Sequence, residues 1–418
     1  MTHAMPGPNN VVRTTLDNGL TLLVRENHSA PVTVLEGYLP VGSIHDPKGQ
    51  FGLASLAATM TTHGSKRYDF EAFNEIIESV GANLSVHGDT HVTGFGLSCL
   101  SEDFPTLLGV LAETLRRPTY PAERLAIVQG QLAVDFQERL HDTQRMSALR
   151  FYETLFGGHP YGRADIGYSE TVASVTPDDL RAFHQAHYTP QGAIIVLSGD
   201  IKTQAAIDNV SQALGDWRGP AANQHLATPA AVSGQRVDID MADKSQADIV
   251  MGCQAVPREH PDFFPIRVAN TILGRFGMMG RLGEVVREQQ GLAYYSYSTQ
   301  EADPAAGAWY ANAGVNPGDV EQAVASIRAE FERLGSEPVG AGELQDSQDF
   351  LTGVLPLTLE TNAGVATTLL NMEWHGLGLD YLSRYNDLIY GVTAEDVQRV
   401  AQTYLRAEDL VTVVAGPG

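Results

Sequence analysis

Cysteine is nearly absent from this chain, which contains only Cys99 and Cys253 among 418 residues. Two cysteines cannot form the disulfide framework that stabilises many small secreted domains, and neither lies beside other residues that bind metals. Both lie in apolar, strand-like stretches. We therefore expect two buried free thiols in a fold that depends on its hydrophobic core.

Basic residues are also scarce, because 27 lysines and arginines face 50 aspartates and glutamates, a net charge of −23 at pH 7. Proteins that bind nucleic acid obtain much of their affinity from basic side chains on phosphates, so this composition argues against such a partner. The acidic balance is compatible with basic peptide ligands and also with a purely solubilising surface. A hydrophobic content of 43% with 18% charged residues indicates a folded globular protein.

No apolar run reaches the roughly 20 residues that a membrane-spanning helix needs. The first residues, Met1–Pro8, lack the basic and apolar segments of a secretory signal. We expect a cytoplasmic protein without a membrane partner.

The chain repeats part of its own sequence. The hexapeptide Val175–Leu180 recurs in similar form as Val392–Val397, 217 residues later. In both copies a threonine followed by acidic residues predicts the start of a helix, and an apolar strand follows. At the same offset, the strand-like stretch Val32–Leu35 matches Ile249–Gly252. Because the length also favours more than one domain, we predict a tandem duplication.

The predicted domains span residues 1–220 and 230–418, joined by a proline- and alanine-rich linker at 219–229. Apolar periodicity predicts the elements of the first half. We expect strands at 20–24, 32–41 and 92–100, and helices at 51–62, 70–80, 104–116 and from Pro121 to about Arg139. This order predicts an α+β fold, in which each half is a mostly antiparallel sheet with helices packed on one face.

Several stretches carry a family resemblance: Leu16–Leu20 before a strand, Gly42–Pro47, Gly158–Gly162 and the long block Gly280–Tyr294. Their order and spacing resemble the pitrilysin/insulinase family, the inverted-zincin metallopeptidases. The resemblance is to its two-domain members, typified by the mitochondrial processing peptidase subunits and their bacterial relatives. It covers essentially the whole chain.

The family keeps the motif H-x-x-E-H where this chain has residues 55–59. Ser55, Ala58 and Thr59 stand at the positions of the first histidine, the glutamate and the second histidine. Zinc needs imidazole and carboxylate ligands, and the glutamate activates the zinc-bound water. The resemblance therefore implies a degenerate motif, no metal in this chain and no hydrolysis by this chain alone.

The third zinc ligand of the family is a glutamate about 77 residues beyond the second histidine. That spacing falls on Phe136, and Asp135 precedes it. Asp135 aligns with the ligand if the alignment has a gap of one residue. A single carboxylate does not make a metal site, and a solvated helix residue is the commoner interpretation.

Arg287 and Tyr294 have a spacing of seven that matches an arginine–tyrosine pair in the family's C-terminal half. In relatives this pair faces the zinc site and holds the substrate backbone or the developing oxyanion. A guanidinium group and a phenol suit that role because both donate hydrogen bonds without being consumed. The structural alternative is that Arg287 caps a helix and that Tyr294 is an aromatic residue of a strand.

His87, Asp89 and His91 are potential metal ligands that share a face if they lie on one strand. The resemblance favours another interpretation, in which a polar strand borders the substrate groove through Asn83, His87 and Asp89 without a metal.

The glycine-punctuated run Gly274–Arg281 lacks the Lys and the Ser or Thr of a phosphate-binding loop. It resembles a shortened form of the glycine-rich loop of the non-catalytic processing-peptidase subunit. An ordinary turn is the alternative.

Together these observations predict the non-zinc-binding subunit of a dimeric zinc metallopeptidase, which helps to bind and orient peptide substrates. This chain would contribute Arg287 and Tyr294 and would need no cofactor of its own. Its partner would be a homologous zinc-binding H-x-x-E-H subunit in a heterodimer, or a second copy in a homodimer. The alternative is a structural or chaperone-like subunit of the same fold, like the core subunits of the respiratory bc1 complex, without a peptidase role.

Overall fold

The computed structural model describes residues 5–221, 226–274 and 280–418, so part of the predicted linker and most of the glycine-punctuated run lie outside the described residues. The chain forms two compact units, each assembled from three segments. Unit 1 comprises Met1–Val134, Ala164–His225 and Pro356–Ser383, and unit 2 comprises Asp135–Arg163, Leu226–Leu355 and Arg384–Gly418. The sequence alone suggested two contiguous ranges, whereas each compact unit also takes one segment from the other half of the sequence.

Unit 1 contains a six-stranded sheet with the order β1-β2-β6-β3-β5-β4. Its strands are β1 (Val12–Thr15), β2 (Thr21–Glu26), β3 (Val32–Leu39), β4 (Asn83–Gly88), β5 (Thr93–Leu100) and β6 (Ile194–Gly199). Only β2 and β6 pair in parallel, and the other neighbours are antiparallel. The predicted strands at 20–24, 32–41 and 92–100 are confirmed within a few residues. The polar strand β4 forms one edge of the sheet.

Unit 2 contains a five-stranded sheet with the order β7-β11-β8-β10-β9. Its strands are β7 (Arg236–Asp240), β8 (Ala247–Ala255), β9 (Ala293–Ala302), β10 (Gly307–Val315) and β11 (Val411–Gly416). This order repeats β2-β6-β3-β5-β4 of unit 1, including the single parallel pair. The predicted duplication is therefore confirmed at the level of sheet topology, with β1 as an addition to unit 1. The predicted match of Val32–Leu35 with Ile249–Gly252 is wrong by three residues, because the register gives β3 and β8 an offset of 214.

The helix starts repeat as well. Thr176 and Thr393 accept hydrogen bonds from the backbone N–H of the third helical residue, and the aspartate at that position accepts one from each threonine backbone. Both are capping boxes, as the sequence predicted. A second repeat was not evident from sequence: the Gln129 amide donates to two carbonyls before the first of these helices, and the Gln348 amide does so before the second.

The helices cover both sheets. Those of unit 1 are α1 (Leu53–Met60), α2 (Phe70–Ser79), α3 (Phe104–Arg116), α6 (Ser169–Ala173), α7 (Pro177–His187), α8 (Thr203–Leu214) and α12 (Asn362–Trp374). Unit 2 contains α5 (Thr143–Phe156), α9 (Phe263–Gly274), α10 (Val320–Ser336), α13 (Tyr381–Tyr390, mostly in this unit) and α14 (Ala394–Tyr404), and α4 (Ala122–Leu140) and α11 (Ala341–Thr358) contribute to both. The predicted helices at 51–62, 70–80, 104–116 and 121–139 are confirmed.

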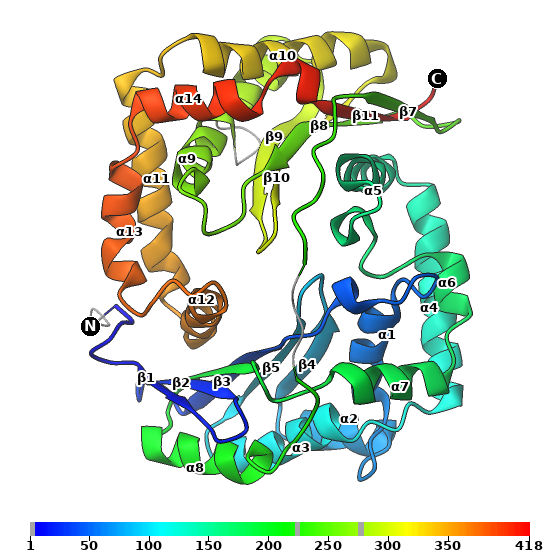
Figure 1. Ribbon diagram of the computed structural model, residues 1–418, viewed down its shortest axis with the longest axis vertical. Coiled ribbons are helices and arrows are strands. Elements are labelled where there is room, and N and C mark those ends of the chain that lie inside the picture. The colour runs from blue at the N-terminus through cyan, green and yellow to red at the C-terminus, as the bar shows by residue number, and fades with distance from the viewer. Residues whose placement is uncertain (1–4, 222–225, 275–279) are drawn as a thin grey trace. The chain divides into compact units, whose positions relative to one another are not determined.

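Each sheet also carries a helix from the other half of the sequence. In unit 1, α3 and α8 lie on one side of the sheet and α12 lies on the other (Figure 1). The side chain of Asn362, at the start of α12, receives hydrogen bonds from Asn27 and Ser198, and Asn371 receives one from Tyr38. The sheet of unit 1 therefore has helices on both faces, whereas the sequence pattern predicted helices on one face.

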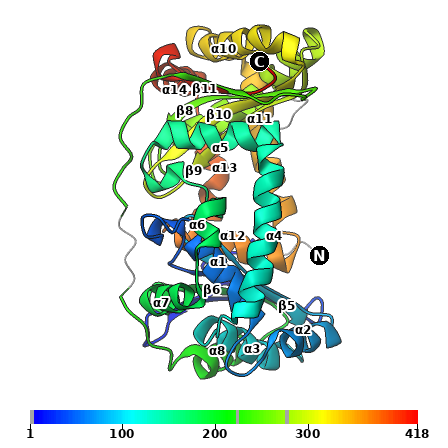
Figure 2. The ribbon, with the colours of Figure 1, turned by 90° about the vertical axis from the view of Figure 1, so that its right-hand side faces the viewer.

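In unit 2, α5 occupies the corresponding place (Figure 2). Val250, Val411 and Val413 of the sheet pack against apolar residues of α5, such as Phe151 and Leu155. The opposite face of the same sheet forms the larger core with α9, α10 and α14, in which Trp309 is fully buried. Both added helices thus bury a sheet face that would otherwise meet water.

Both cysteines are free and buried, as predicted. Burial raises the pKa of the Cys99 thiol to about 11 and that of the Cys253 thiol to about 12, which keeps both in the unreactive thiol form. Within the described ranges, no helix combines the length and the apolar character needed to cross a membrane.

Candidate functional site

Helix α1 carries the degenerate motif. Asp46 accepts hydrogen bonds from the backbone N–H groups of Gly52 and Ala54, both at 2.7 Å, and so caps the start of the helix. Ala58 is fully buried. The Thr59 hydroxyl donates to the Ser55 carbonyl at 3.0 Å, so it is bound within its own helix.

Strand β4 lies directly against α1. A Cβ atom added to Gly88 would lie 2.7 Å from the Ser55 Cα, so only glycine allows this approach. The three motif positions offer two hydroxyls and a methyl group, none of which replaces imidazole or carboxylate as a zinc ligand. Among residues 5–221, 226–274 and 280–418, no group of three or more His, Cys, Asp or Glu side chains is arranged to hold a metal ion.

Asp135 and Phe136 lie in the second half of α4. Asp135 accepts two hydrogen bonds from one nitrogen of Arg145, at 2.9 and 2.8 Å, so its carboxylate already has a cationic partner. Phe136 is buried, with 3% of its surface exposed, and Arg139 lies over its ring. These contacts give both residues structural roles in this chain.

The segment from His87 to His91 does not form one continuous strand. Strand β4 ends at Gly88, and Asp89 begins a turn in which its backbone N–H donates to the Val92 carbonyl. His87 and Asp89 are exposed, whereas His91 is buried. The three side chains therefore do not converge as metal ligands. Asn83, Ser85 and His87 instead alternate along the exposed face of an edge strand.

The register of the sheet joins these residues to a larger polar face. Ser85 pairs with Gly96 and His87 pairs with Gly94 on β5, and these glycines pair with Glu36 and Tyr38 on β3. We name this surface the β4–β5 polar face, and its members are Glu36, Tyr38, Asn83, Ser85, His87, Gly94, Gly96 and Ser98. Glu36 and Tyr38 were not singled out from the sequence, because only the register brings them beside β4.

Side chains fold over the two glycines of this face. A Cβ atom on Gly94 would lie 2.5 Å from the His87 ring, and one on Gly96 would lie 3.0 Å from a Glu36 carboxylate oxygen. Burial raises the pKa of the Glu36 carboxyl. Burial also raises the pKa of Tyr38, with further contributions from the negative charges of Asp89 and Glu36. The face therefore has a negative electrostatic character.

Arg287 and Tyr294 lie at the start of the β9 edge of unit 2. Arg287 belongs to a π-helical turn, Gly283–Gln289, and its Nε lies 3.7 Å from a carboxylate oxygen of Glu288. Tyr294 is 58% exposed, and its hydroxyl donates to Asn316 at 2.7 Å. The phenol is exposed and the guanidinium is partly exposed, so both are hydrogen-bond donors at the surface of unit 2.

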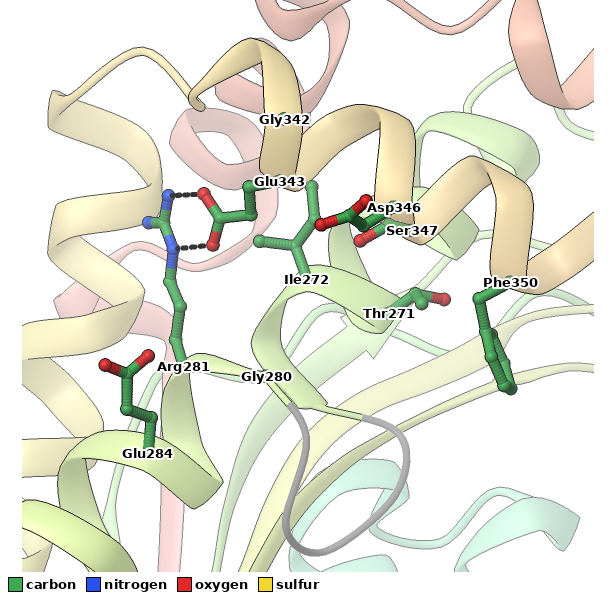
Figure 3. A pocket seen from close by; sticks show the side chains of 10 residues that line it. All are labelled: Thr271, Ile272, Gly280, Arg281, Glu284, Gly342, Glu343, Asp346, Ser347 and Phe350. Atoms are coloured by element: carbon green, nitrogen blue, oxygen red, sulfur yellow. Dashed lines mark hydrogen bonds and ion pairs between the residues drawn. The ribbon is translucent and has the colours of Figure 1, made fainter.

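A cavity of about 430 Å³ opens in unit 2 between α9, α11 and the residues that follow Gly280 (Figure 3). Arg281 is buried in its wall and donates to both carboxylate oxygens of Glu343, at 2.7 and 2.8 Å. The carboxylates of Glu284 and Asp346 also line it, so acidic groups outnumber the single cation. Gly280 and Arg281, at the end of the glycine-punctuated run, line the cavity, and residues 275–279 of that run lie outside the described residues.

Two family models match the chain. The model for insulinase, peptidase family M16, matches residues 21–164, and the model for the peptidase M16 inactive domain matches residues 174–351. An uncharacterized zinc protease of Streptomyces coelicolor is 26% identical over 424 residues, which cover 98% of this chain and 90% of the relative.

Two further relatives resemble the chain over most of its length. The non-peptidase homolog YmxG of Helicobacter pylori is 23% identical over 396 residues, 94% of this chain and 91% of the relative. The crystal structure of a peptidase M16 inactive domain from Pseudomonas fluorescens matches with a TM-score of 0.92 and 26% identity over 98% of both chains. The matches span both duplicated halves, and this chain therefore belongs to the insulinase family of peptidases, family M16, as a member whose metal-binding motif is degenerate.

Proposed function

We propose that this chain is the non-zinc-binding subunit of a dimeric metallopeptidase and that it binds and orients peptide substrates for a partner with an intact H-x-x-E-H motif. The observation that carries the proposal is a contrast within one chain. The metal positions Ser55, Ala58 and Thr59 are occupied by side chains that cannot bind zinc, whereas Arg287 and Tyr294 remain accessible hydrogen-bond donors.

The partner's zinc would supply the activated water, because α1 of this chain has no residues that fit a metal. The Arg287 guanidinium and the Tyr294 hydroxyl would bind the peptide backbone or the oxygen that becomes negatively charged. For Tyr294, this requires its hydroxyl to exchange Asn316 for the ligand.

Peptide binding has a second structural basis in unit 1. Among the strands that the structure describes, β4 pairs with β5 alone, so its other edge has backbone N–H and C=O groups without a strand partner there. An extended peptide can add to such an edge as a further strand, with alternate side chains on each face of the sheet. The exposed, polar pattern of Asn83, Ser85 and His87 suits a surface that receives different peptides.

The test is reconstitution of the pair. This chain is mixed with a family member from the same source that carries H-x-x-E-H. The turnover of a quenched peptide by the mixture is compared with the turnover by the H-x-x-E-H partner alone. We expect a complex of defined stoichiometry and faster turnover than that of the partner alone. Lack of association, or association without any change in turnover, would contradict the proposal. The second outcome would favour the structural-subunit alternative.

A further inference from the structure

The inference concerns Glu36, whose surroundings differ from those of Glu301, the other half-buried carboxylate in the described strands, which accepts hydrogen bonds from two tyrosines. Glu36 lies in the middle of β3, on the face where Ser85 and His87 are exposed. No hydrogen bond or ion pair joins its carboxylate to another side chain among the described residues. Removing a carboxylate from water without such a partner is unfavourable, and nearby cations are the usual compensation.

The duplicated sheet of unit 2 supplies an internal comparison. Glu36 pairs with Val196 on β6, and Val250 pairs with Val413 on β11, so Val250 holds the place of Glu36. By the same register, Tyr310 and Asn312 hold the places of Gly94 and Gly96. The common topology therefore does not require a carboxylate or the two glycines at these places.

The difference extends to the edge strand. Ser85 pairs with Gly96, and Tyr297 pairs with Asn312, so a tyrosine in unit 2 replaces the serine of unit 1. In unit 1, glycines and a serine hold these places beside the half-buried Glu36 side chain. In unit 2, tyrosine rings fill the corresponding surface.

We propose that Glu36 is a specificity residue, whose carboxylate binds the guanidinium or ammonium group of an arginine or lysine side chain in an extended peptide on the β4 edge. This proposal rests on the proposed peptide-binding function and adds the preferred side chain. Asp89, at the end of β4, contributes to the same negative field that attracts a cation.

The length of the peptide side chain determines whether its polar group can reach the Glu36 carboxylate. Neighbouring strands are about 4.8 Å apart, so a peptide strand outside β4 lies about 10 Å from β5. The Glu36 carboxylate extends from β3 until it lies over Gly96 on β5. A lysine or arginine side chain has three or four methylene groups and can cross β4 above Ser85 to meet it, whereas a short polar side chain cannot.

The experiment measures peptide binding to the full chain by fluorescence anisotropy. Labelled, extended dodecapeptides carry a single arginine at successive positions, and each is compared with the same peptide containing citrulline, the neutral isostere. We expect arginine to bind on the order of tenfold more tightly than citrulline at one register position, as for a hydrogen-bonded charge pair. Glu36→Gln should abolish that preference and leave citrulline binding unchanged.

Two further variants sharpen the result. Glu75→Gln changes an exposed carboxylate on α2 and should keep the arginine preference, which controls for net charge. Ser85→Tyr introduces the residue found in unit 2 and should block the preference while Glu36 is retained. A preference that survives Glu36→Gln would overturn the inference alone. A wild-type chain that binds none of the peptides would overturn the peptide-binding function and the inference together.

Discussion

The two sheets share one topology but use corresponding faces differently. In unit 2 the polar groups beneath α5 are paired: Asp248 accepts hydrogen bonds from Thr143, Gln246 and Tyr295. In unit 1 the corresponding position is Val34, and the nearby carboxylate of Glu36 has no side-chain partner among the described residues. Both copies therefore hold an added helix through polar side chains, but unit 1 also leaves one carboxylate on the same sheet face without a side-chain partner among the described residues.

This difference shows what duplication leaves free to change. Strand order, the capping boxes and the glutamine that binds the turn between helices recur in both copies, because they determine the fold. The residues on one sheet face do not recur. A sheet face tolerates substitution when its partner helix still packs, and it is the part on which the two copies have diverged in side-chain chemistry.

The largest expected effect concerns α1, the helix of unit 1 that carries the degenerate motif. We expect the purified wild-type chain to contain less than about 0.1 zinc per chain, because Ser55, Ala58 and Thr59 supply no ligand. Ser55→His with Thr59→His places two imidazoles one helical turn apart and should raise zinc affinity roughly a thousandfold, measured by calorimetry.

Ala58→Glu is left out of that variant because Ala58 is fully buried, and a glutamate there would also lower stability. As a control, Glu71→His with Glu75→His places the same pair of histidines on α2. Elemental analysis that finds one tightly held zinc in the wild-type chain would show that the metal comes from residues other than the motif.

The next effect concerns Arg287 and Tyr294, which have no assigned counterparts in unit 1. In the reconstituted pair, Arg287→Ala or Tyr294→Phe should lower turnover about a hundred- to a thousandfold, equivalent to about 2.7–4 kcal/mol. Their exposure predicts that the melting temperature changes little. Thermal melts are recorded beside the kinetics. If the mutants have lowered melting temperatures but normal peptide turnover per folded dimer, both residues have structural roles.

Sequence periodicity was sufficient to predict the helices and strands that bury one face. The helix 104–116 was predicted with its final bounds, because leucines recur at helical spacing and are buried in the structure. Periodicity did not predict strand β4, because its polar residues give no apolar alternation. Only the family resemblance indicated a polar strand through Asn83, His87 and Asp89, and pairing with β5 defines its bounds, which end before Asp89. The positions of α5 and α12 were also not predicted, because an apolar helix face indicates burial but does not identify the sheet that covers it.

The residues of the candidate site also include some that the sequence could identify and one that it could not. Ser55, Ala58 and Thr59 could be identified because a known motif marks their positions. Glu36 could not, since one acidic residue in the strand Val32–Leu39 has the same pattern as a solvent-facing side chain. Its significance depends on the two glycines of β5, about 60 residues away in sequence, and on the open edge beyond them. Long-range register of this kind is absent from local sequence patterns.

A change in stability tests the paired network of unit 2. Asp248→Val introduces a valine, as at the equivalent Val34 of unit 1, and leaves the hydroxyls of Thr143 and Tyr295 without their acceptor. Because each buried donor without a partner costs about 1–3 kcal/mol, we expect a loss of about 3 kcal/mol or more in the free energy of unfolding. Urea unfolding followed by fluorescence measures it, with the exposed Asp240→Val as control. Equal, small losses in both variants would contradict the network's structural role.

The smallest effect compares how the two added helices are held. Tyr152 of α5 and Tyr310 both donate to the Glu301 carboxylate, whereas Tyr38 donates to the neutral side chain of Asn371 on α12. Hydrogen bonds to charged groups contribute about 1.5–3 kcal/mol and neutral ones about 0.5–1.5 kcal/mol, so Tyr152→Phe should destabilise more than Tyr38→Phe. Thermal melts should separate the two variants by about 2–4 °C for each kcal/mol of difference. Equal shifts would mean that α5 and α12 are held with similar strength, and that the faces of the two units differ in ligand access but not in how their helices are attached.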